Sequence, residues 1–412
     1  MESPASRLGL NALNFFIAAV QTGFGPFIAV LLTQQGWSQT EVGFALSIGT
    51  FTALLGQLPG GWLVDRVHRK RPITTAALAT IAASALILAT LPSRGPVWAA
   101  EVLHALASCV IAPAIAAITL RLCGHAGYGE RLGVNARYAS LGSAAAAALL
   151  GACAWFLSER MVFVVTAALV LPALIALYSV RAEDRAEEET HPALLHPRER
   201  RRRGRPRHPF GEPALHVFAF ATVFFHLSGA AMLPLALGEL ARTTPQTGFV
   251  VSAVIIVPQV MVAALSPWAG RLAARLGRRP VLLAGFAAVP LRGVLLAALF
   301  AMHPAALPLV VIQAVDGVAA AVFGVMLPLI AADTTRRSGS LNLAIGALGL
   351  AVGLGATGST SLAGVLADQF GVQLALLGLA AAGAFGTAVI WLFMPETIPA
   401  HLHRTPTRAI AA

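Results

Sequence analysis

The sequence predicts an all-α membrane protein in which twelve transmembrane helices form two pseudo-symmetric six-helix bundles. Three observations lead to this prediction: an apolar composition, a series of long apolar segments, and a similarity between the two halves of the chain. Of the 412 residues, 57% are hydrophobic and only 11% are charged, whereas about 25% of the residues in a soluble domain are charged. This composition is typical of a protein that lies in a membrane.

The apolar segments have the length that a membrane requires. The hydrocarbon core of a bilayer is about 30 Å thick, so a helix that crosses it needs about 20 predominantly apolar residues. A helix also satisfies its own backbone hydrogen bonds where water is absent. Twelve segments meet these requirements, and we predict membrane spans at residues 8–32, 40–63, 73–93, 97–121, 132–155, 159–180, 213–237, 246–270, 281–301, 305–331, 341–364 and 371–394.

One long polar segment, residues 181–212, divides these spans into two sets of six. It changes from acidic (AEDRAEEE) to basic (RERRRRGRPRH), and its prolines discourage a continuous fold. We predict a mostly disordered cytoplasmic linker at 181–212, an N-terminal bundle at 1–180, and a C-terminal bundle at 213–412 that ends in a short cytoplasmic tail. The basic stretch could attract anionic lipid headgroups.

The basic residues indicate how the chain is oriented, because Lys and Arg accumulate in cytoplasmic loops. With the N-terminus inside, 25 of the 29 Lys and Arg residues are cytoplasmic, Arg292 lies within a span, and three lie outside: Arg94, Arg160 and Arg242. We expect a multi-pass protein of the cytoplasmic (inner) membrane with both termini in the cytoplasm. The net charge of +11 does not indicate a nucleic-acid partner, because the basic residues lie between apolar stretches.

The two halves of the chain repeat each other. The segment GGWLVDRVHRKRP (60–72) follows the second span, and AGRLAARLGRRP (269–280) follows the eighth. Two further pairs of segments, EVGFALS with QTGFVVS and VNARYASLG with LNLAIGALG, and the prolines Pro26 and Pro234 also match, at a spacing of about 207 residues. Bundles duplicated in this way are common in transporters, where the substrate site lies between them. The loop segments align Gly61 with Gly270, Arg66 with Arg275, and Arg69 with Arg278.

The cluster after the second span resembles the signature of the major facilitator superfamily of secondary transporters, and the resemblance extends over essentially the whole chain. It rests on Gly61, Asp65, Arg66, Arg69 and Lys70. The resemblance implies two six-helix bundles around a central cavity that opens alternately to each side. It also implies a cytoplasmic latch between the bundles, to which Asp65 supplies the negative charge and Arg66 and Arg69 the positive charges.

The second copy of this loop carries Ala274 in place of Asp65, so we expect the latch to be asymmetric. An exposed ion pair contributes only ~0–1 kcal/mol, which suits a contact that opens in every cycle. The alternative interpretation is that both loops are only basic topology signals.

Ionisable residues within spans are candidates for chemistry, because a charge at mid-bilayer costs at least ~2.5–3.5 kcal/mol. Glu101 and His104 share one face of the fourth span, and Gln313 and Asp316 hold equivalent positions in the tenth. His226 lies in the seventh span. We predict that Glu101, His104, His226 and Asp316 form a network for proton coupling and substrate binding, in which an imidazole can change charge near neutral pH. Alternatively, each is a buried polar residue bonded to a neighbouring helix.

Further polar residues of the spans are candidates for the substrate cavity. They are Asn14 and Gln21, which are seven residues apart in the first span, together with Gln259 and Gln313 in the second half. Hydrogen bonds between helices are an equally good explanation. For Arg292 we favour a structural partner, such as a carboxylate or helix carbonyls, over an anion-binding role.

These features predict a proton-coupled secondary transporter that exports a small organic compound by alternating access. No nucleotide-binding motif of the form G-x-x-x-x-G-K-[ST] occurs, so the energy is expected to come from a gradient. The alternative is a proton-coupled importer of a small metabolite or a siderophore-type chelate. A receptor or scaffold without transport activity is less favoured.

The expected partners are the small-molecule substrate, protons and membrane lipids. We expect a monomer that is not an enzyme, has no cofactor and does not bind nucleic acid. Its three cysteines, Cys109, Cys123 and Cys153, lack the spacing of metal ligands or of a disulfide framework, so we also expect no metal site.

Overall fold

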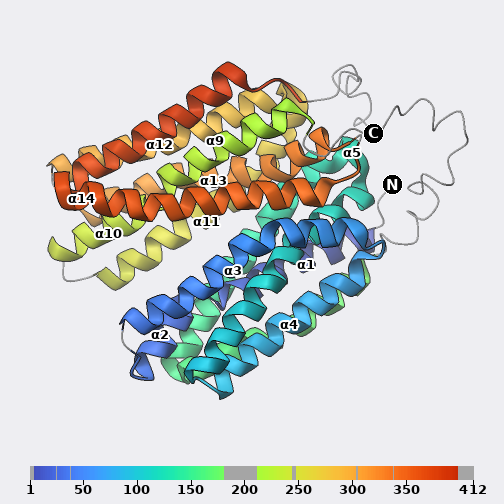
Figure 1. Cartoon of the computed structure of the whole chain (residues 1–412), viewed down its shortest axis with the longest axis horizontal. Coiled ribbons are helices and arrows are strands. Elements are labelled where there is room, and N and C mark those ends of the chain that lie inside the picture. The colour runs from blue at the N-terminus through green and yellow to red at the C-terminus, as the bar shows by residue number, and fades with distance from the viewer. Residues whose placement is uncertain are drawn as a thin grey trace, which may run out of the picture. The chain divides into compact units, whose positions relative to one another are not determined.

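The computed structural model describes residues 4–24, 26–37, 39–180, 211–243, 247–302, 305–336 and 338–397. This described part of the chain is helical and contains no strand (Figure 1). The predicted linker lies outside it, except for residues 211–212. The helices up to residue 180 are α1 (Pro4–Thr22), α2 (Pro26–Gln34), α3 (Gln39–Arg66), α4 (Lys70–Thr90), α5 (Arg94–Phe156), α6 (Glu159–Ala168) and α7 (Val170–Ser179).

The helices after the linker follow the same order of spans. They are α9 (Pro213–Gly229), α10 (Met232–Thr243), α11 (Thr247–Leu276), α12 (Arg278–Met302), α13 (Ala306–Thr334) and α14 (Leu341–Phe393). All twelve predicted spans coincide with these helices or with parts of them, which confirms the all-α fold with twelve membrane helices.

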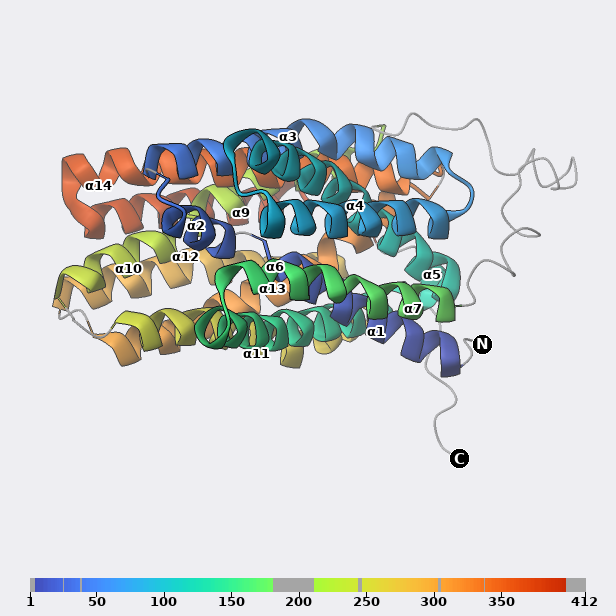
Figure 2. The same cartoon turned by 90° about the horizontal axis from the view of Figure 1, so that it is seen from below.

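Two of these long helices each contain two spans that join at a glycine. Gly124 in α5 has φ 65°, and Gly371 in α14 has φ 81°. Backbone with positive φ is accessible to glycine without the steric cost that a Cβ imposes, so the chain reverses direction at these positions. The two arms of α14 meet at this turn (Figures 1 and 2).

Three predicted spans are each interrupted at one point, although Glu159–Ser179 and Pro213–Leu237 each still form one apolar segment long enough to cross a membrane. The breaks separate α1 from α2, α6 from α7, and α9 from α10. In each case a proline, Pro26, Pro172 or Pro234, stands at the first or third residue of the second helix. Proline is tolerated there because the first N–H groups of a helix have no intrahelical partner.

The chain divides into two compact units. Of the described residues, those within Met1–Cys123, Val134–Arg207 and Arg337–Leu350 form the first unit, and those within Gly124–Gly133, His208–Arg336 and Ala351–Ala412 form the second. The beginning of α14 therefore packs with helices of the first half of the sequence. Residues Gly124–Gly133 of α5 likewise pack with helices of the second half of the sequence.

Each unit has an apolar interior and an apolar outer surface. Leu10, Leu13 and Phe163 are fully or almost fully buried in the first unit, and Phe218 and Phe286 in the second. Large apolar side chains are also exposed in both units, among them Trp155, Leu171, Ile175, Met302 and Leu307. An exposed apolar surface of this extent is accounted for by contact with lipid. Eight segments of the described chain are long and apolar enough to cross a membrane.

Candidate functional site: a helix cap and a buried carboxyl group

Asp65 in the last turn of α3 binds the beginning of α14, and both segments belong to the first unit. One carboxylate oxygen, Oδ1, accepts hydrogen bonds from the backbone N–H of Asn342 (3.1 Å) and from its side-chain amide (2.7 Å). The other, Oδ2, accepts from the backbone N–H of Leu343 (2.8 Å). The first N–H groups of a helix lack intrahelical partners, and the helix dipole favours a negative charge there. Asp65 therefore acts as a remote cap of α14.

Close backbone contact between α3 and α14 accompanies this cap. A Cβ at Gly61 would collide with the carbonyl oxygen of Asn342, and a Cβ at Gly346 would collide with that of Gln57. Small residues allow membrane helices to approach this closely. The glycine of the loop signature thus lets the two helices approach closely beside the cap.

The basic residues of the signature contact other groups. The guanidinium of Arg66 lies 3.8 Å from the centre of the Trp62 ring, a cation–π arrangement. Arg69 occupies the N-cap position of α4 and is exposed. The predicted contribution of Arg66 and Arg69 to the latch stays a prediction.

Lys70 and Arg71 each bind the carbonyl end of a helix. The ammonium of Lys70, which is 4% exposed, donates to the carbonyls of Val64 and Val67, where α3 ends. Arg71 donates to the carbonyl of Val180 just after α7. Cations in this position complement both the unpaired carbonyls and the negative end of the helix dipole.

The second loop repeats this arrangement with its register shifted by one residue. Arg278 donates to the carbonyl of Ala273 (2.7 Å) near the end of α11, as Lys70 does at α3. Helix α12 begins at Arg278 and α4 begins at Lys70, so Lys70 is the structural equivalent of Arg278. The alignment of Arg69 with Arg278 was therefore wrong, because the first loop is one residue longer.

The second loop is also held by acidic residues. Arg278 forms an ion pair with Asp333 (3.0 Å), and both side chains are almost fully buried. The carboxylate of Glu396 accepts hydrogen bonds from the backbone N–H groups of Arg278 (2.8 Å) and Arg279 (3.1 Å). The segment that follows α14 therefore caps α12 within the second unit.

Glu101 is a buried carboxyl group without a partner. It lies in α5, seven residues after the helix begins at Arg94, which places it about 10 Å along the helix axis. The residue is 5% exposed and its Oε1 atom is buried without a hydrogen bond. Within the described chain, Glu101 has neither a hydrogen bond nor an ion pair.

His104, one turn further along α5, is held by α1. Its Nε2 atom lies 2.9 Å from the Oε1 atom of Gln21, and the amide of Gln21 donates to the hydroxyl of Ser108 (3.1 Å). The ring of Phe24 stacks on the imidazole at 3.7 Å between centroids, with an interplanar angle of 5°. Asn14 instead donates to the carbonyl of Leu10 in its own helix (2.8 Å).

The equivalent positions of the second unit carry an ion pair. Arg292 in α12 is 2% exposed and donates to Oδ1 of Asp316 (2.6 Å) and to Oε1 of Gln313 (2.8 Å), both in α13. A carboxylate partner is what we expected for Arg292. Because α12 and α4 begin at equivalent residues, position 292 corresponds to Ser84, whose hydroxyl donates to the carbonyl of Ala100 (2.7 Å). The first unit thus has no cation at the position of Arg292.

The remaining candidates lie in the second unit. His226 in α9 is half-buried, with its ring 4.8 Å from that of Phe323, and Gln259 in α11 is half-buried. The members of the predicted network therefore divide between the two units, with Glu101 and His104 in the first and His226 and Asp316 in the second. Its function as a network stays a prediction.

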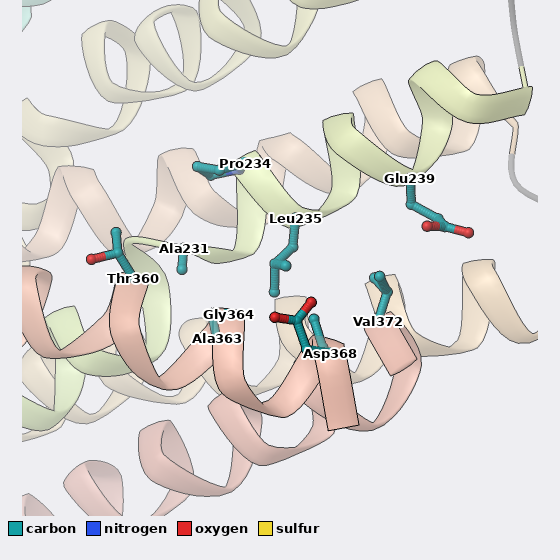
Figure 3. Close-up of a pocket in the computed structure, with 10 residues that line it drawn as sticks. Ala231, Pro234, Leu235, Glu239, Thr360, Ala363, Gly364, Asp368 and Val372 are labelled. Carbon is teal, nitrogen blue, oxygen red and sulfur yellow. The ribbon is translucent and has the colours of Figure 1, made fainter. Parts of the chain in front are cut away.

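A hollow in the second unit was not predicted from the sequence. It has a volume of about 330 Å³ and lies where α9 breaks into α10, against α14 (Figure 3). Leu235 and Glu239 point from α10 toward α14, and Asp368 points from α14 toward α10. The break itself is closed by Ser359, whose hydroxyl accepts a hydrogen bond from the N–H of Ala231 (3.0 Å). Interrupted helices often mark substrate sites in transporters. Pro234, which lines this hollow, was therefore the residue in the sequence that could have indicated it.

Residues 10–238 and 217–412 match the sequence profile of the Major Facilitator Superfamily. The chain belongs to this superfamily. An uncharacterized MFS-type transporter of Mycobacterium tuberculosis strain H37Rv, Rv2456c, is 32% identical over 413 residues, which cover 96% of this chain and 94% of the relative. The corresponding protein of strain CDC 1551 / Oshkosh, MT2531, matches to the same extent.

Solved structures of the superfamily share the fold. The human organic anion transporter MFSD10 (TETRAN) superposes with a TM-score of 0.72 at 14% identity, over 94% of this chain and all of that chain. The proton:xylose symporter XylE, bound to 6-bromo-6-deoxy-D-glucose, has a TM-score of 0.72 at 15% identity, over 95% of each chain. As a member of the major facilitator superfamily, this chain is a multi-pass membrane transporter.

Proposed function

We propose that this transporter is proton-coupled and exports a small, largely apolar organic compound by alternating access. We place it in the cytoplasmic membrane as a monomer, with both termini inside. The observation that carries the proposal is the buried carboxyl group of Glu101, which has no hydrogen bond or ion pair within the described chain.

The energetics of this group support proton coupling. An isolated carboxylate is very costly in an apolar environment, so a carboxyl group buried without a partner is held as the neutral acid. When a conformational change brings water to the group, ionisation is no longer penalised. A carboxyl group that is dry in one state and wet in another therefore takes up a proton in the first and releases it in the second.

The direction of transport is inferred from the small number of free polar groups in the spans. Asn14, Gln21 and Gln313 already form hydrogen bonds with the protein, which leaves few groups to recognise a highly hydroxylated substrate. A largely apolar compound fits this lining better. Such compounds enter cells through the bilayer unaided, so a dedicated carrier is useful chiefly for export.

The cap on α14 is the proposed latch of the cycle. Hydrogen bonds to a charged group contribute about 1.5–3 kcal/mol each, which is enough to favour one state and small enough to be overcome by ligand binding. The three bonds to Asp65 hold α3 against the first turn of α14. Breaking them would free α14 to move away from α3.

A flux experiment tests the proposal. A screen of growth inhibitors and metabolites in a deletion strain identifies a compound that accumulates when the gene is absent. The purified protein in proteoliposomes is then expected to drive that compound against its gradient when a pH gradient is imposed, and a protonophore should abolish the effect. Depletion instead of accumulation in the deletion strain would indicate import, and ligand binding without flux would indicate a receptor.

The ion pair of the second unit yields a separate prediction about stability. Replacing Asp316 with asparagine leaves the buried Arg292 without its charge partner. Breaking a fully buried pair costs about 3–5 kcal/mol, and we expect a smaller loss here because the side chain of Asp316 is 34% exposed and solvent screens its charge. We expect a clear fall in the thermal unfolding temperature of the detergent-solubilised protein. The double variant Arg292→Met/Asp316→Leu should be more stable than Asp316→Asn alone. Equal stability of all three proteins would contradict a structural role for the pair.

A further inference from the structure

Helix α3 presents two different faces to its neighbours in the first unit. On the face toward α5, a Cβ at Gly49 would meet the carboxyl group of Glu101, a Cβ at Gly56 would lie 3.0 Å from Sγ of Cys109, and one at Gly60 would lie 2.8 Å from the carbonyl oxygen of Cys109. The opposite contact, through Gly61 and Asp65, is with the beginning of α14. One helix thus touches both the buried acid and the latch.

The contact between Gly49 and Glu101 is very close. A Cβ added to Gly49 would collide with Oε2 of Glu101 and would lie 3.4 Å from its Cδ atom. With any larger residue at this position, the carboxyl group of Glu101 would have to move from its present place. The side chain of Glu101 is therefore packed directly against the backbone of α3.

We propose that Gly49 is the positioning residue for the proton on Glu101: its missing side chain forms the dry seat of the carboxyl group, and movement of α3 away from α5 opens that seat to water. This inference rests on the proposed proton coupling and identifies the element that controls it. Because α3 also carries Asp65, release of the latch and release of the proton would involve the same helix.

No charged group of the described chain competes with Gly49 in controlling Glu101. The neighbouring imidazole of His104 in α5 is directed at Gln21 of α1. Helix α4 approaches through the hydroxyl of Ser84, which donates to the carbonyl of Ala100. The ionisable residues of α3 and α4 stand toward the ends of these helices and are Glu41, Asp65, Arg66, Lys70 and Arg71; the first of them is paired with Arg94 of α5.

Infrared spectroscopy of the detergent-solubilised protein tests the inference with protons as the only ligand. The C=O band of a protonated carboxyl group that is present in the wild type and absent in Glu101→Gln reports the state of this residue, and a pH titration gives its midpoint. Gly49→Ala pushes the carboxyl group out of its seat toward water. We expect the midpoint to fall by about one pH unit, which is tenfold weaker proton binding.

A double-mutant cycle separates positioning from general damage. In a Glu101→Asp background the side chain is shorter by one methylene, so adding Gly49→Ala should leave the titration midpoint nearly unchanged. Gly56→Ala is the matched control, because it adds a methyl group to the same face of α3 beside Cys109 and should not move the midpoint. Equal shifts for Gly49→Ala and Gly56→Ala, or no shift for Gly49→Ala, would overturn the inference.

Failure of the underlying function gives a different result. If Glu101→Gln removes no titrating band, Glu101 does not hold a proton and the proposed coupling loses its basis. If that band is present and titrates but Gly49→Ala leaves its midpoint in place, the coupling stands and only the role of Gly49 is wrong.

Discussion

Replacing Glu101 with glutamine is expected to abolish proton-driven accumulation of the substrate while leaving substrate exchange intact. Glutamine has nearly the shape of a protonated glutamate but cannot release a proton. Both conformations of the carrier remain accessible to the variant, so labelled substrate should still exchange across the membrane. Net transport coupled to a pH gradient should be lost.

The expected size of the effect follows from the imposed pH gradient. One proton exchanged per substrate builds up a concentration ratio of about tenfold for each pH unit, because one unit corresponds to about 1.36 kcal/mol. With a gradient of about two units, the ratio should be about 100 in the wild type and about one in Glu101→Gln. Proteoliposomes with an imposed pH gradient measure this ratio, and counterflow of labelled substrate measures exchange.

Glu41→Gln is the matched control for this experiment. Glu41 lies in the first turn of α3 and forms an ion pair with the exposed Arg94. It is therefore an acid with a charge partner, whereas Glu101 is a buried acid without one. We expect nearly normal accumulation in this variant. Full proton-driven accumulation by Glu101→Gln would show that the coupling group lies elsewhere.

Asp65→Asn is expected to impair transport strongly without affecting membrane insertion. The carboxylate accepts three hydrogen bonds at the first turn of α14, and asparagine keeps the shape of the side chain but loses the charge and one acceptor. Loss of about 2–3 kcal/mol from this contact would change the balance between conformations by roughly 30- to 140-fold. Transport slows because one state of the cycle becomes poorly populated.

Two measurements and a comparison variant examine this prediction. The yield in the membrane fraction reports insertion, which should be unchanged because the basic residues that set topology remain. Initial rates of transport should fall by at least about tenfold. Arg66→Gln serves as a comparison, since Arg66 lies on the ring of Trp62 and its loss leaves the cap intact. Normal transport by Asp65→Asn would mean that the loop serves only as a topology signal.

The membrane spans could be predicted from the sequence because the signal for them is local. A bilayer requires about 20 apolar residues in succession, and that pattern survives whatever the helices pack against. The three broken spans were harder to predict, although Pro26, Pro172 and Pro234 mark the places. A proline in a membrane helix is compatible with either a kink or a break, and the choice depends on which neighbour satisfies the freed backbone groups.

The register of the loop repeat shows a similar limit. Matching arginines suggested that Arg69 corresponds to Arg278, but the residues that bind equivalent helix ends are Lys70 and Arg278. Pro72 lies two residues after Lys70, and Pro280 lies two residues after Arg278. Aligning these two prolines would have given the correct register. Charge alone could not reveal it, because neighbouring basic residues are interchangeable in composition and differ only in which carbonyl they reach.

The sequence by itself determined the number of spans, the duplication of the chain and the identity of the ionisable residues within the membrane, since each depends on composition and order along the chain. Only the tertiary structure decided what those residues touch. It paired Asp316 with Arg292, placed Asp65 on the N–H groups of α14, and left Glu101 against Gly49 without a partner. Whether a buried carboxyl group is compensated depends on the helices that pack beside it, and those neighbours are distant in sequence.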